Sequence, residues 1–356
     1  MKVLTVIGNR PQFVKAAAVS VRLRESHDEL LVHTGQHFDD ELSAIFFSEL
    51  GIPAPDRELG VSGGSNTSQT ARMLGELEPV LTDAAPDLVL VYGDTNSTLA
   101  GALAGALAHV PVAHVEAGMR SFDRSMPEER NRVLTDHASE LLLCSSEVAV
   151  ENLRRESAGG LIELVGDVMV DIARSLQPRA RERLDLVEAR GLRPQGYVLA
   201  TAHRAGNVDL PERLSMLVDL LVAVPEPVLL PLHPRTAARL EAAGLIDRLR
   251  SEGNVRLTPP LGYVELTALL CNARAVLTDS GGLQKEAYFA GVPCVTLRPS
   301  TEWTETVDHG WNVLVDLDRD AALAALQREP PVDRPELYGD GHAGERVVAA
   351  LTLLSR

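Results

Sequence analysis

The sequence has few cysteines, no excess of basic residues and no uninterrupted apolar run of membrane length, and each absence excludes a class of protein. Its three cysteines lie in or beside apolar runs without CxxC spacing: Cys144, Cys271 and Cys294. Such thiols are typical of a reduced core and do not indicate a zinc site. Asp and Glu number 50 against 34 Lys and Arg, a net charge of −16. This acidic balance argues against a general nucleic-acid surface, because phosphate backbones attract basic surfaces.

Neither a secretion signal nor a membrane span is expected. The first apolar run, MKVLTVIG, turns polar at Asn9 and Arg10, too early for a signal peptide. The longest apolar-rich stretch, residues 95–115, is interrupted by glycines and by Pro111. It predicts a buried helix followed by a strand rather than a transmembrane helix. Together with the reduced thiols, this indicates a cytoplasmic protein.

Three common nucleotide and metal signatures are also missing. No GxGxxG follows the first apolar run, which disfavours a dinucleotide cofactor. The absence of GxxxxGK[ST] disfavours a P-loop ATPase, and no HExxH or carboxylate–histidine spacing indicates a metal. We therefore expect neither a metal nor another cofactor.

Short apolar runs alternate with helical patterns along the whole chain. The expected strands are residues 2–7, 30–34, 87–92, 110–115, 141–144, 161–164, 197–201, 227–232, 255–257, 275–277, 294–297 and 313–315. Segments between them, such as 67–84, 211–224 and 263–272, carry apolar residues at three-to-four spacing, which predicts helices. Strands that alternate with helices indicate parallel sheets built from βαβ units.

The length of 356 residues exceeds one ordinary core, so we expect two domains. The alternation restarts after a charged helical stretch, residues 175–190, and the loop GLRPQG. The expected fold class is α/β, with two Rossmann-like doubly wound domains and a cleft between them. We place the first domain at residues 1–168 and the second at 169–341, with a final amphipathic helix, 342–356, packing back on the first.

Polar and ionisable residues follow many of the expected strands. In open parallel sheets, ligands bind beyond the carboxyl ends of the strands, so these positions are candidate site residues. In the first half they are Arg10, Lys15, Asp94, Glu116, Glu128 and Arg132. In the second half they are His203, His233, Ser280, Gly281 and Gly282, with Glu286 on the helix that follows.

Each of these residues alone has an ordinary explanation. Asp94, Thr95 or Ser97 would serve as a helix N-cap, and the two histidines would serve as hydrogen-bonded residues near a core. Glu128 and Arg132 stand one helical turn apart, which is the spacing of a solvated ion pair. The coincidence of such residues at so many strand ends favours an active site.

The residue types also predict a division of labour. Asp94, Glu116 and Glu128 are three carboxylates in one domain, and closely spaced carboxylates let one hold a proton while another stays ionised. In the second domain, residues 280–282 (SGG) precede a helix whose bare N–H groups and dipole favour an anion. The alternative is a strand-to-helix bend that glycine merely permits.

Six segments together resemble the UDP-N-acetylglucosamine 2-epimerase family in order and spacing: VIGNRPQFVKAAAV, VYGDTNSTLAGALA, VAHVEAGMRS, MPEERNRVLTDH, ATAHRAGN and LTDSGGLQKEA. The resemblance covers nearly the whole chain. It implies the glycosyltransferase B fold, a homodimer, and a UDP-sugar substrate handled without metal or nicotinamide. It also implies reversible epimerisation at C2 of UDP-N-acetylglucosamine to UDP-N-acetylmannosamine, through elimination of UDP to 2-acetamidoglucal and its re-addition.

The same resemblance implies a role for each candidate residue. Asp94, Glu116 and Glu128 become the acid and base set, with Arg132 as their partner. His203 becomes a catalytic residue beside the diphosphate and the sugar. The remaining UDP-sugar contacts fall to Arg10, Ser280, Gly281 and Gly282 at the phosphates, Glu286 at the ribose, and Lys15 and His233 elsewhere in the cleft.

The sequence departs from better-known bacterial members at three places. Trp303 and Thr304 replace an Arg-Pro pair, and Leu266 replaces a base-stacking aromatic residue. The segment TGQHFDDELS lacks a glutamine that binds an activating second UDP-sugar in some members, so such activation is not expected. GNRPQFVK and EWTET are closer to a subgroup that includes epimerases of UDP-diacetamido-uronic acids.

Several functions therefore stay open at this point. One is a hydrolysing epimerase that releases N-acetylmannosamine and UDP, and another is a 2-epimerase of a UDP-2,3-diacetamido-uronic acid. A glycosyltransferase of the same fold would use the same UDP site, but three carboxylates around the sugar would be hard to explain. A non-catalytic nucleotide-sugar binding protein would keep its ligand affinity in Asp94→Asn and Glu116→Gln.

Overall fold

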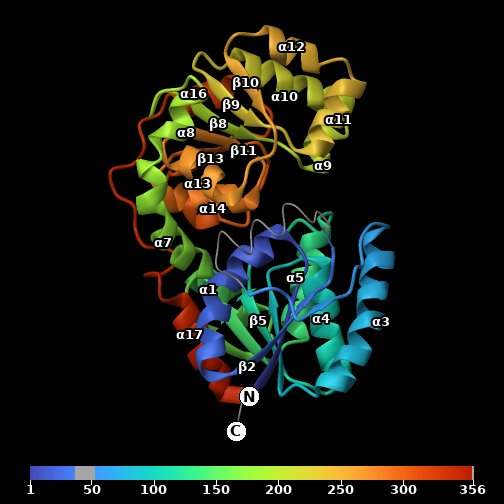
Figure 1. Ribbon diagram of the computed structural model, residues 1–356. Coiled ribbons are helices and arrows are strands. Elements are labelled where there is room, and N and C mark those ends of the chain that lie inside the picture. The colour runs from blue at the N-terminus through green and yellow to red at the C-terminus, as the bar shows by residue number, and fades with distance from the viewer. Residues whose placement is uncertain (37–52, 355–356) are drawn as a thin grey trace. The chain divides into compact units, whose positions relative to one another are not determined.

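The computed structural model describes residues 1–36 and 53–354, which form two compact units (Figure 1). Unit 1 comprises Met1–Arg174 and Glu336–Arg356, and unit 2 comprises Ser175–Pro335. The sequence placed these boundaries at residues 168 and 341 instead. The chain belongs with unit 1 already before residue 341, because Tyr338 O accepts a hydrogen bond from Asp167 N at 2.8 Å.

Within the described residues, unit 1 contains one parallel sheet with the strand order β3-β2-β1-β4-β5-β6-β7. Its strands are β1 (Lys2–Ile7), β2 (Asp28–His33), β3 (Arg57–Glu58), β4 (Leu88–Tyr92), β5 (Val112–Ala117), β6 (Leu141–Cys144) and β7 (Leu161–Leu164). Its helices are α1 (Arg10–Ser26), α3 (Asn66–Ala84), α4 (Asn96–Leu107), α5 (Pro127–His137), α6 (Glu147–Arg155), α17 (Ala343–Leu351) and the 3₁₀ helix η1 (Thr352–Leu354). The sequence did not predict β3, because its two exposed residues carry no apolar pattern.

Helix α7 (Val168–Glu182) leads from unit 1 into unit 2. The described part of unit 2 contains a second parallel sheet, in the order β10-β9-β8-β11-β12-β13. Its strands are β8 (Val198–Thr201), β9 (Val228–Pro231), β10 (Val255–Thr258), β11 (Ala275–Thr278), β12 (Cys294–Thr296) and β13 (Asn312–Leu314). Its helices are α8 (Leu184–Glu188), α9 (Ala205–Val208), α10 (Pro211–Ala223), α11 (Pro234–Ala242), α12 (Ile246–Ser251), α13 (Tyr263–Cys271), α14 (Gly281–Ala290), α15 (Thr304–Asp308) and α16 (Arg319–Leu326).

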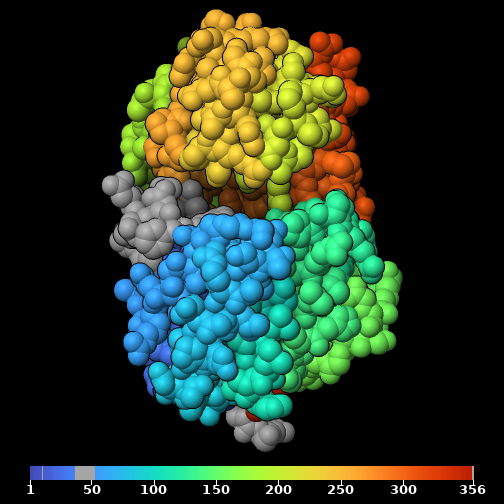
Figure 2. Space-filling view, turned by 90° about the vertical axis from the view of Figure 1, so that its right-hand side faces the viewer, coloured from blue at the N-terminus to red at the C-terminus, as the bar shows by residue number. Residues whose placement is uncertain are grey.

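Helices cover both faces of the unit 1 sheet, which explains why its central strands are apolar throughout. All five residues of β4 are buried, as is usual for a parallel strand between two helical layers. Figure 1 shows α1 and α17 on one face of the sheet and α3, α4 and α5 on the other. Helix α3 buries one stripe of residues, including Met73 and Leu77, and its outer face forms part of the surface in Figure 2. The predicted α/β class with two doubly wound sheets is confirmed.

Counted along the chain, the described strands of unit 2 have the Rossmann order 3-2-1-4-5-6, and those of unit 1 have the same order with a seventh strand added after the sixth. The order reverses between β1 and β4 in unit 1 and between β8 and β11 in unit 2. Ligands bind at such reversal points because the loops leaving the two strands diverge there. The segments that follow these four strands carry Arg10, Asp94, His203 and Ser280.

The predicted buried helix within residues 95–115 is α4, which lies directly on the sheet. Nine of its twelve residues are buried. A Cβ atom on Gly101 would lie 2.9 Å from Val91 Cγ1, and one on Gly105 would lie 2.8 Å from Val112 Cγ2. The two glycines therefore let the helix backbone approach β4 and β5 closely, which fixes its first turn next to Asp94.

The last helix, α17, packs against α1 and is capped by a residue of α7. Asp171 of α7 accepts hydrogen bonds from Ala343 N at 3.0 Å and Gly344 N at 2.8 Å, and so caps the start of α17. A Cβ atom on Gly344 would lie 2.3 Å from Ala18 O of α1, so the two helices approach as closely as glycine allows. The C-terminal helix thus completes one helical layer of unit 1.

The sequence also predicted that the protein has no membrane span and that its cysteines are reduced and buried. No helix in residues 1–36 and 53–354 combines the length and the apolarity that crossing a bilayer requires. All three cysteines are free and buried. Burial raises the pKa of Cys294 to about 12, so this thiol stays protonated at neutral pH.

Candidate active site

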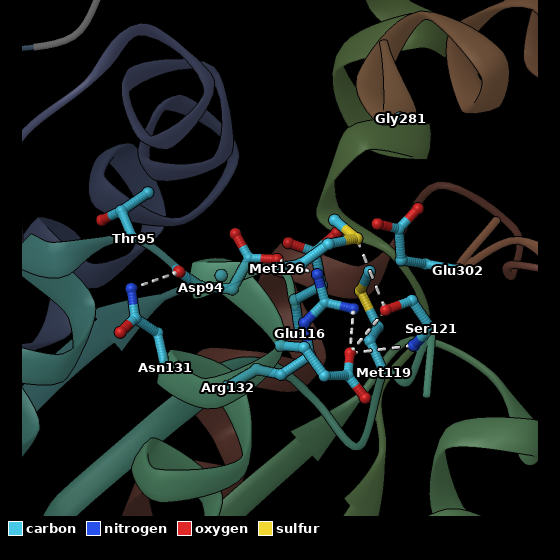
Figure 3. A network of polar contacts seen from close by, with 12 residues as sticks. Asp94, Thr95, Glu116, Met119, Ser121, Met126, Asn131, Arg132, Gly281 and Glu302 are labelled. Carbon is cyan, nitrogen blue, oxygen red and sulfur yellow. Dashed lines mark hydrogen bonds and ion pairs between the residues drawn. The ribbon is translucent and has the colours of Figure 1, made fainter. Parts of the chain in front are cut away.

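Two carboxylates leave the unit 1 sheet from neighbouring strands. Asp94 follows β4 after a single glycine, and Glu116 lies near the end of β5, which pairs with β4. Asn131 of α5 donates a hydrogen bond to Asp94 O at 3.1 Å, which fixes the backbone at that position (Figure 3). The sheet therefore brings these two predicted residues to one edge of the unit.

The Asp94 side chain forms an ion pair with Arg132 of α5. The capping explanation for Asp94 is wrong, because Thr95 caps α4 by accepting a hydrogen bond from Thr98 N. The solvated-pair explanation for Arg132 is also wrong, because its side chain is only 3% exposed. Arg132 donates a second bond to Glu129 at 3.1 Å. A buried guanidinium held between carboxylates is a fixed positive charge beside Asp94.

Glu116 has an uncommon backbone conformation. Its φ of +73° lies in the left-handed region that non-glycine residues rarely occupy. The pairing of β5 with β6 shifts register between Val115 and Ala117, so Glu116 is the extra residue of a bulge. Such bulges re-aim a side chain, and strain of about 1–3 kcal/mol of this kind gathers at functional sites. The buried Glu116 carboxylate forms an ion pair with Lys15 of α1.

Gly93 makes room for that ion pair. Its φ is +66°, and a Cβ atom there would lie 2.9 Å from Lys15 Nζ and 3.4 Å from Glu116 Oε2. The turn at Gly93 therefore borders the Lys15–Glu116 pair and leads directly into Asp94. Lys15, which the sequence placed in the cleft without a specific role, is thus a direct neighbour of Glu116.

Two consecutive acids begin α5, where the helix dipole favours negative charge. Glu129 is buried and accepts hydrogen bonds from Ser121 N at 2.9 Å and Phe122 N at 3.0 Å, in addition to its bond from Arg132. Glu128 is half-buried on the same turn. The sequence selected Glu128 and left Glu129 out, because adjacent acids do not reveal which one turns inward.

In unit 2, the start of α14 is open to a ligand. Ser280 is its N-cap, and Gly281 and Gly282 are its first residues, neither with a positive φ. A Cβ atom on Gly282 would have only Ser280 Oγ within reach, at 4.0 Å, so the fold does not require glycine there. The bend explanation is therefore weak, and exposed N–H groups at a helix start fit an anion. Glu286 is half-buried one turn further along.

His203 lies beside this helix start, in the loop after β8. Its backbone N–H and that of Arg204 donate to the buried Asp279 carboxylate at 3.0 and 2.9 Å. Its ring stacks on His233, with 5.4 Å between the ring centroids. Burial lowers the pKa of His203 below its ordinary value, outweighing Asp279, which raises it, so the neutral ring predominates at neutral pH. Asp279 is a site residue that the sequence analysis missed, although it stands two residues after the predicted strand 275–277.

Trp303, one of the departures from the better-known sequences, borders the same helix start. Its indole Nε1 donates a hydrogen bond to Gly281 O at 2.9 Å. The buried Lys285 lies with its Nζ 4.1 Å from the centre of the Trp303 ring, a cation–π contact. Leu266, the second departure, packs against the apolar core of unit 2.

The predicted residues thus gather at one place in each unit. Unit 1 brings together Lys15, Asp94, Glu116 and Arg132, with Glu128 on the first turn of α5. Unit 2 brings together His203, His233, Ser280, Gly281 and Gly282, with Glu286 on α14. The side chain of Arg10 and residues 37–43 of TGQHFDDELS lie outside the described residues. Among those described, no three His, Cys, Asp or Glu side chains gather in a way that could hold a metal ion.

Comparison with known proteins adds the family. The family model described as UDP-N-acetylglucosamine 2-epimerase matches residues 20–352. A UDP-2,3-diacetamido-2,3-dideoxy-D-glucuronate 2-epimerase from Pseudomonas aeruginosa is 47% identical and covers 99% of this chain and 100% of its own. A UDP-N-acetylglucosamine 2-epimerase homolog from Methanococcus maripaludis is 45% identical over 99% of both chains. The crystal structure of Methanocaldococcus jannaschii UDP-GlcNAc 2-epimerase in complex with UDP-GlcNAc and UDP has a TM-score of 0.93 at 39% identity, over 99% of this chain and 100% of that one. The chain therefore belongs to the UDP-N-acetylglucosamine 2-epimerase family.

Proposed function

We propose that this protein epimerises C2 of UDP-N-acetylglucosamine, interconverting it with UDP-N-acetylmannosamine. The observation that carries the proposal is the pair of carboxylates on neighbouring strands, Glu116 on a strained bulge against Lys15 and Asp94 against the buried Arg132. Membership of the family and the names of the relatives support the substrate.

The proposed reaction breaks and remakes two bonds. A base takes the C2 proton, the electrons of the C–H bond form the C1=C2 double bond, and the C1–O bond breaks so that UDP leaves with its electron pair. A proton then adds to C2 on the opposite ring face while UDP oxygen attacks C1. Inversion at carbon requires proton-transfer groups on both faces, which is why more than one carboxylate is needed. We assign this role to Asp94, Glu116 and Glu128, with Arg132 and Lys15 setting their charge.

We assign the diphosphate to the open helix start of unit 2. UDP gains negative charge as the C1–O bond breaks, and preorganised N–H donors stabilise such charge. The N–H groups of the half-buried Gly281 and the exposed Gly282 support this role, and the neutral His203 beside them is suited to hydrogen bonding with the diphosphate or the sugar. We further assign Arg10 to the phosphates and Glu286 to the ribose hydroxyls, with His233 as an additional contact.

A second candidate substrate is a UDP-2,3-diacetamido-glucuronate. The relative from Pseudomonas aeruginosa with that name is 47% identical over essentially the whole chain, which favours this alternative specifically. The same carboxylates would perform the same C2 chemistry, since the substituents at C3 and C6 do not take part in it. A panel of UDP-sugars modified at C3 and C6 would separate the two by their kcat/KM values.

Incubation with UDP-N-acetylglucosamine in D₂O tests the proposed reaction. We expect deuterium at C2 of both UDP-sugars, because the proton that returns comes from a group in exchange with solvent. Nuclear magnetic resonance would follow the label and the products together. Free N-acetylmannosamine would show a hydrolysing enzyme instead, and UDP-sugars without deuterium at C2 would contradict epimerisation.

We also propose that the protein works as a homodimer in the cytoplasm. The family resemblance of its six segments supports the dimer, and three free buried thiols support a reducing compartment. Light scattering should give twice the mass of one chain, and a monomer mass at assay concentrations would contradict the dimer.

A further inference from the structure

A buried polar network lies behind the two carboxylates of unit 1 and has no part in the chemistry proposed above. At its centre is Asp136, near the end of α5, whose side chain is wholly buried. Its two oxygens contact His114 Nδ1 at 2.7 Å, an Arg120 guanidinium nitrogen at 2.7 Å and Gly118 N at 3.2 Å. Burial alone would raise the pKa of Asp136, but His114 and then Arg120 lower it below its ordinary value, so the group is a carboxylate.

The contacts of Asp136 bracket Glu116. His114 stands two residues before it on β5, and Gly118, whose N–H donates to Asp136, stands two residues after it. Glu116 itself is the extra residue of the bulge and has a φ of +73°. A conformation of this kind persists only when its surroundings over-determine it. Asp136 supplies such surroundings, because it accepts a hydrogen bond from the backbone N–H of Gly118 after the strained residue and contacts the His114 imidazole before it.

The network also reaches the second carboxylate. His114 Nε2 lies 2.7 Å from Gly93 O, and it must be the donor because a carbonyl oxygen only accepts. Gly93 is the turn residue directly before Asp94. One chain of contacts, Asp136–His114–Gly93, therefore runs from the bulge that aims Glu116 to the turn that aims Asp94.

Stability alone does not explain such a network. Removing charges from water is costly, and well-packed apolar side chains of similar volume often give equal or greater stability than a buried ion pair. What the polar network provides and an apolar core does not is a set of directional bonds to Gly93 O and Gly118 N. Gly93 directly precedes Asp94, and Gly118 stands two residues after Glu116.

We propose that Asp136, acting through His114, is a positioning residue that aims the Glu116 and Asp94 carboxylates. The inference rests on the proposed function, in which these carboxylates transfer the C2 proton. It assigns no substrate contact to Asp136 or His114. A positioning role predicts that loss of the network slows the chemical step while leaving UDP-sugar binding nearly intact, because displacement of reacting groups by about 1 Å costs up to about 10²-fold in rate.

The first test is Asp136→Asn, measured in kcat and KM per folded molecule. We expect kcat to fall about 30- to 100-fold with KM changed by less than about threefold. The matched control is Glu29→Gln. Glu29, on β2, is an equally buried carboxylate of unit 1 outside the candidate site, and it accepts bonds from Thr5 of β1 and from Ser20 and Arg24 of α1. It should lose stability but keep kcat within about threefold. Equal kcat losses in both variants would overturn the inference.

The second test changes His114, and it can be used even if the Asp136→Asn variant does not fold. His114→Gln places an amide N–H near the position of Nε2 and keeps the bond to Gly93 O, whereas His114→Asn places its amide near Nδ1 and loses that bond. We expect the Gln variant to keep about tenfold more activity than the Asn variant. Equal activities, or the reverse order, would contradict the link from the network to Asp94.

A third measurement separates this inference from the proposed function. Amide hydrogen exchange reports the local opening of segments 93–96 and 114–120 whether or not the reaction has been assigned correctly. In Asp136→Asn these segments should exchange about tenfold faster than in Glu29→Gln. If wild-type protein does not incorporate deuterium at C2 in D₂O, the proposed function is wrong. If amide exchange of these segments in Asp136→Asn equals that of wild type, the positioning role is wrong.

Discussion

Glu116→Gln is expected to lower kcat for C2 exchange by about 10²- to 10⁴-fold, the range typical of lost acid–base catalysis. The amide keeps the size of the side chain but can neither take nor deliver the C2 proton. It also removes the negative charge that pairs with the largely buried Lys15. Deuterium uptake at C2 of UDP-N-acetylglucosamine, followed by nuclear magnetic resonance, measures the effect directly.

Asp94→Asn should give a loss in the same range for the same reason. Its partner Arg132 keeps its bond to Glu129, so the fold of α5 should persist. UDP affinity, measured by calorimetry, is the control, because the diphosphate is assigned to unit 2 and should bind within about threefold of wild type. Losses below tenfold in both variants would count against an acid–base role for these carboxylates and would favour a non-catalytic nucleotide-sugar binding protein.

Gly93→Ala is expected to abolish most activity, with a loss of about 10²-fold or more. Two effects add at this position. An alanine pays about 1–2 kcal/mol for the left-handed backbone, and its Cβ would lie 2.9 Å from Lys15 Nζ. The lysine must move, and the Glu116 carboxylate moves with it.

Gly60→Ala separates the two effects. Gly60 has a φ of +65°, almost the same as Gly93, but a Cβ atom there would meet nothing within 4 Å. This variant should therefore lose only the backbone contribution, about 1–2 kcal/mol in the free energy of unfolding, and keep its kcat. Thermal unfolding and the deuterium assay, run on both variants, compare them. Equal activity in the two variants would show that the space at Gly93 does not matter for catalysis.

The fold was largely predictable from the sequence because parallel strands covered on both faces are apolar throughout. LVLVY in β4 is such a run, and the described strands except β3 were predicted to within two residues at each end. The two residues of β3, Arg57 and Glu58, are exposed, so no apolar pattern marks them. The strand order also explains why the candidate residues gather. Parallel strands have their carboxyl ends at the same edge of the sheet, and the candidate residues follow the strands next to the reversal point.

The side-chain geometry at the site was less predictable. The sequence offered Asp94, Thr95 and Ser97 equally as caps of α4, because hydroxyl and carboxylate side chains all accept bonds at a helix start. It selected Glu128 rather than Glu129, since one step along a helix turns a side chain by about 100° and no local pattern shows which acid faces inward. The roles of the predicted residues stay predictions until the variants are measured.

The positive φ of Glu116 had no signal in the sequence at all. Left-handed backbone is usually foretold by glycine or asparagine, and a glutamate at the end of an apolar strand gives no such indication. At Gly93 the sequence does give a signal, because a glycine between a strand and an acid predicts a turn. Only the structure shows why glycine is needed there, since a Cβ atom would meet Lys15.

The order of the segments along the chain has a consequence for synthesis on the ribosome. Unit 1 begins at the N-terminus, but the helix that covers α1 begins only at Ala343, after all of unit 2 has been made. The face of α1 around Ala18 therefore stays uncovered while the intervening 161 residues, Ser175–Pro335, emerge and fold as a complete insert. A nascent chain stalled before Gly344 carries a finished second unit and an unfinished first one, so truncation near the C-terminus harms the part of the protein that is translated earliest.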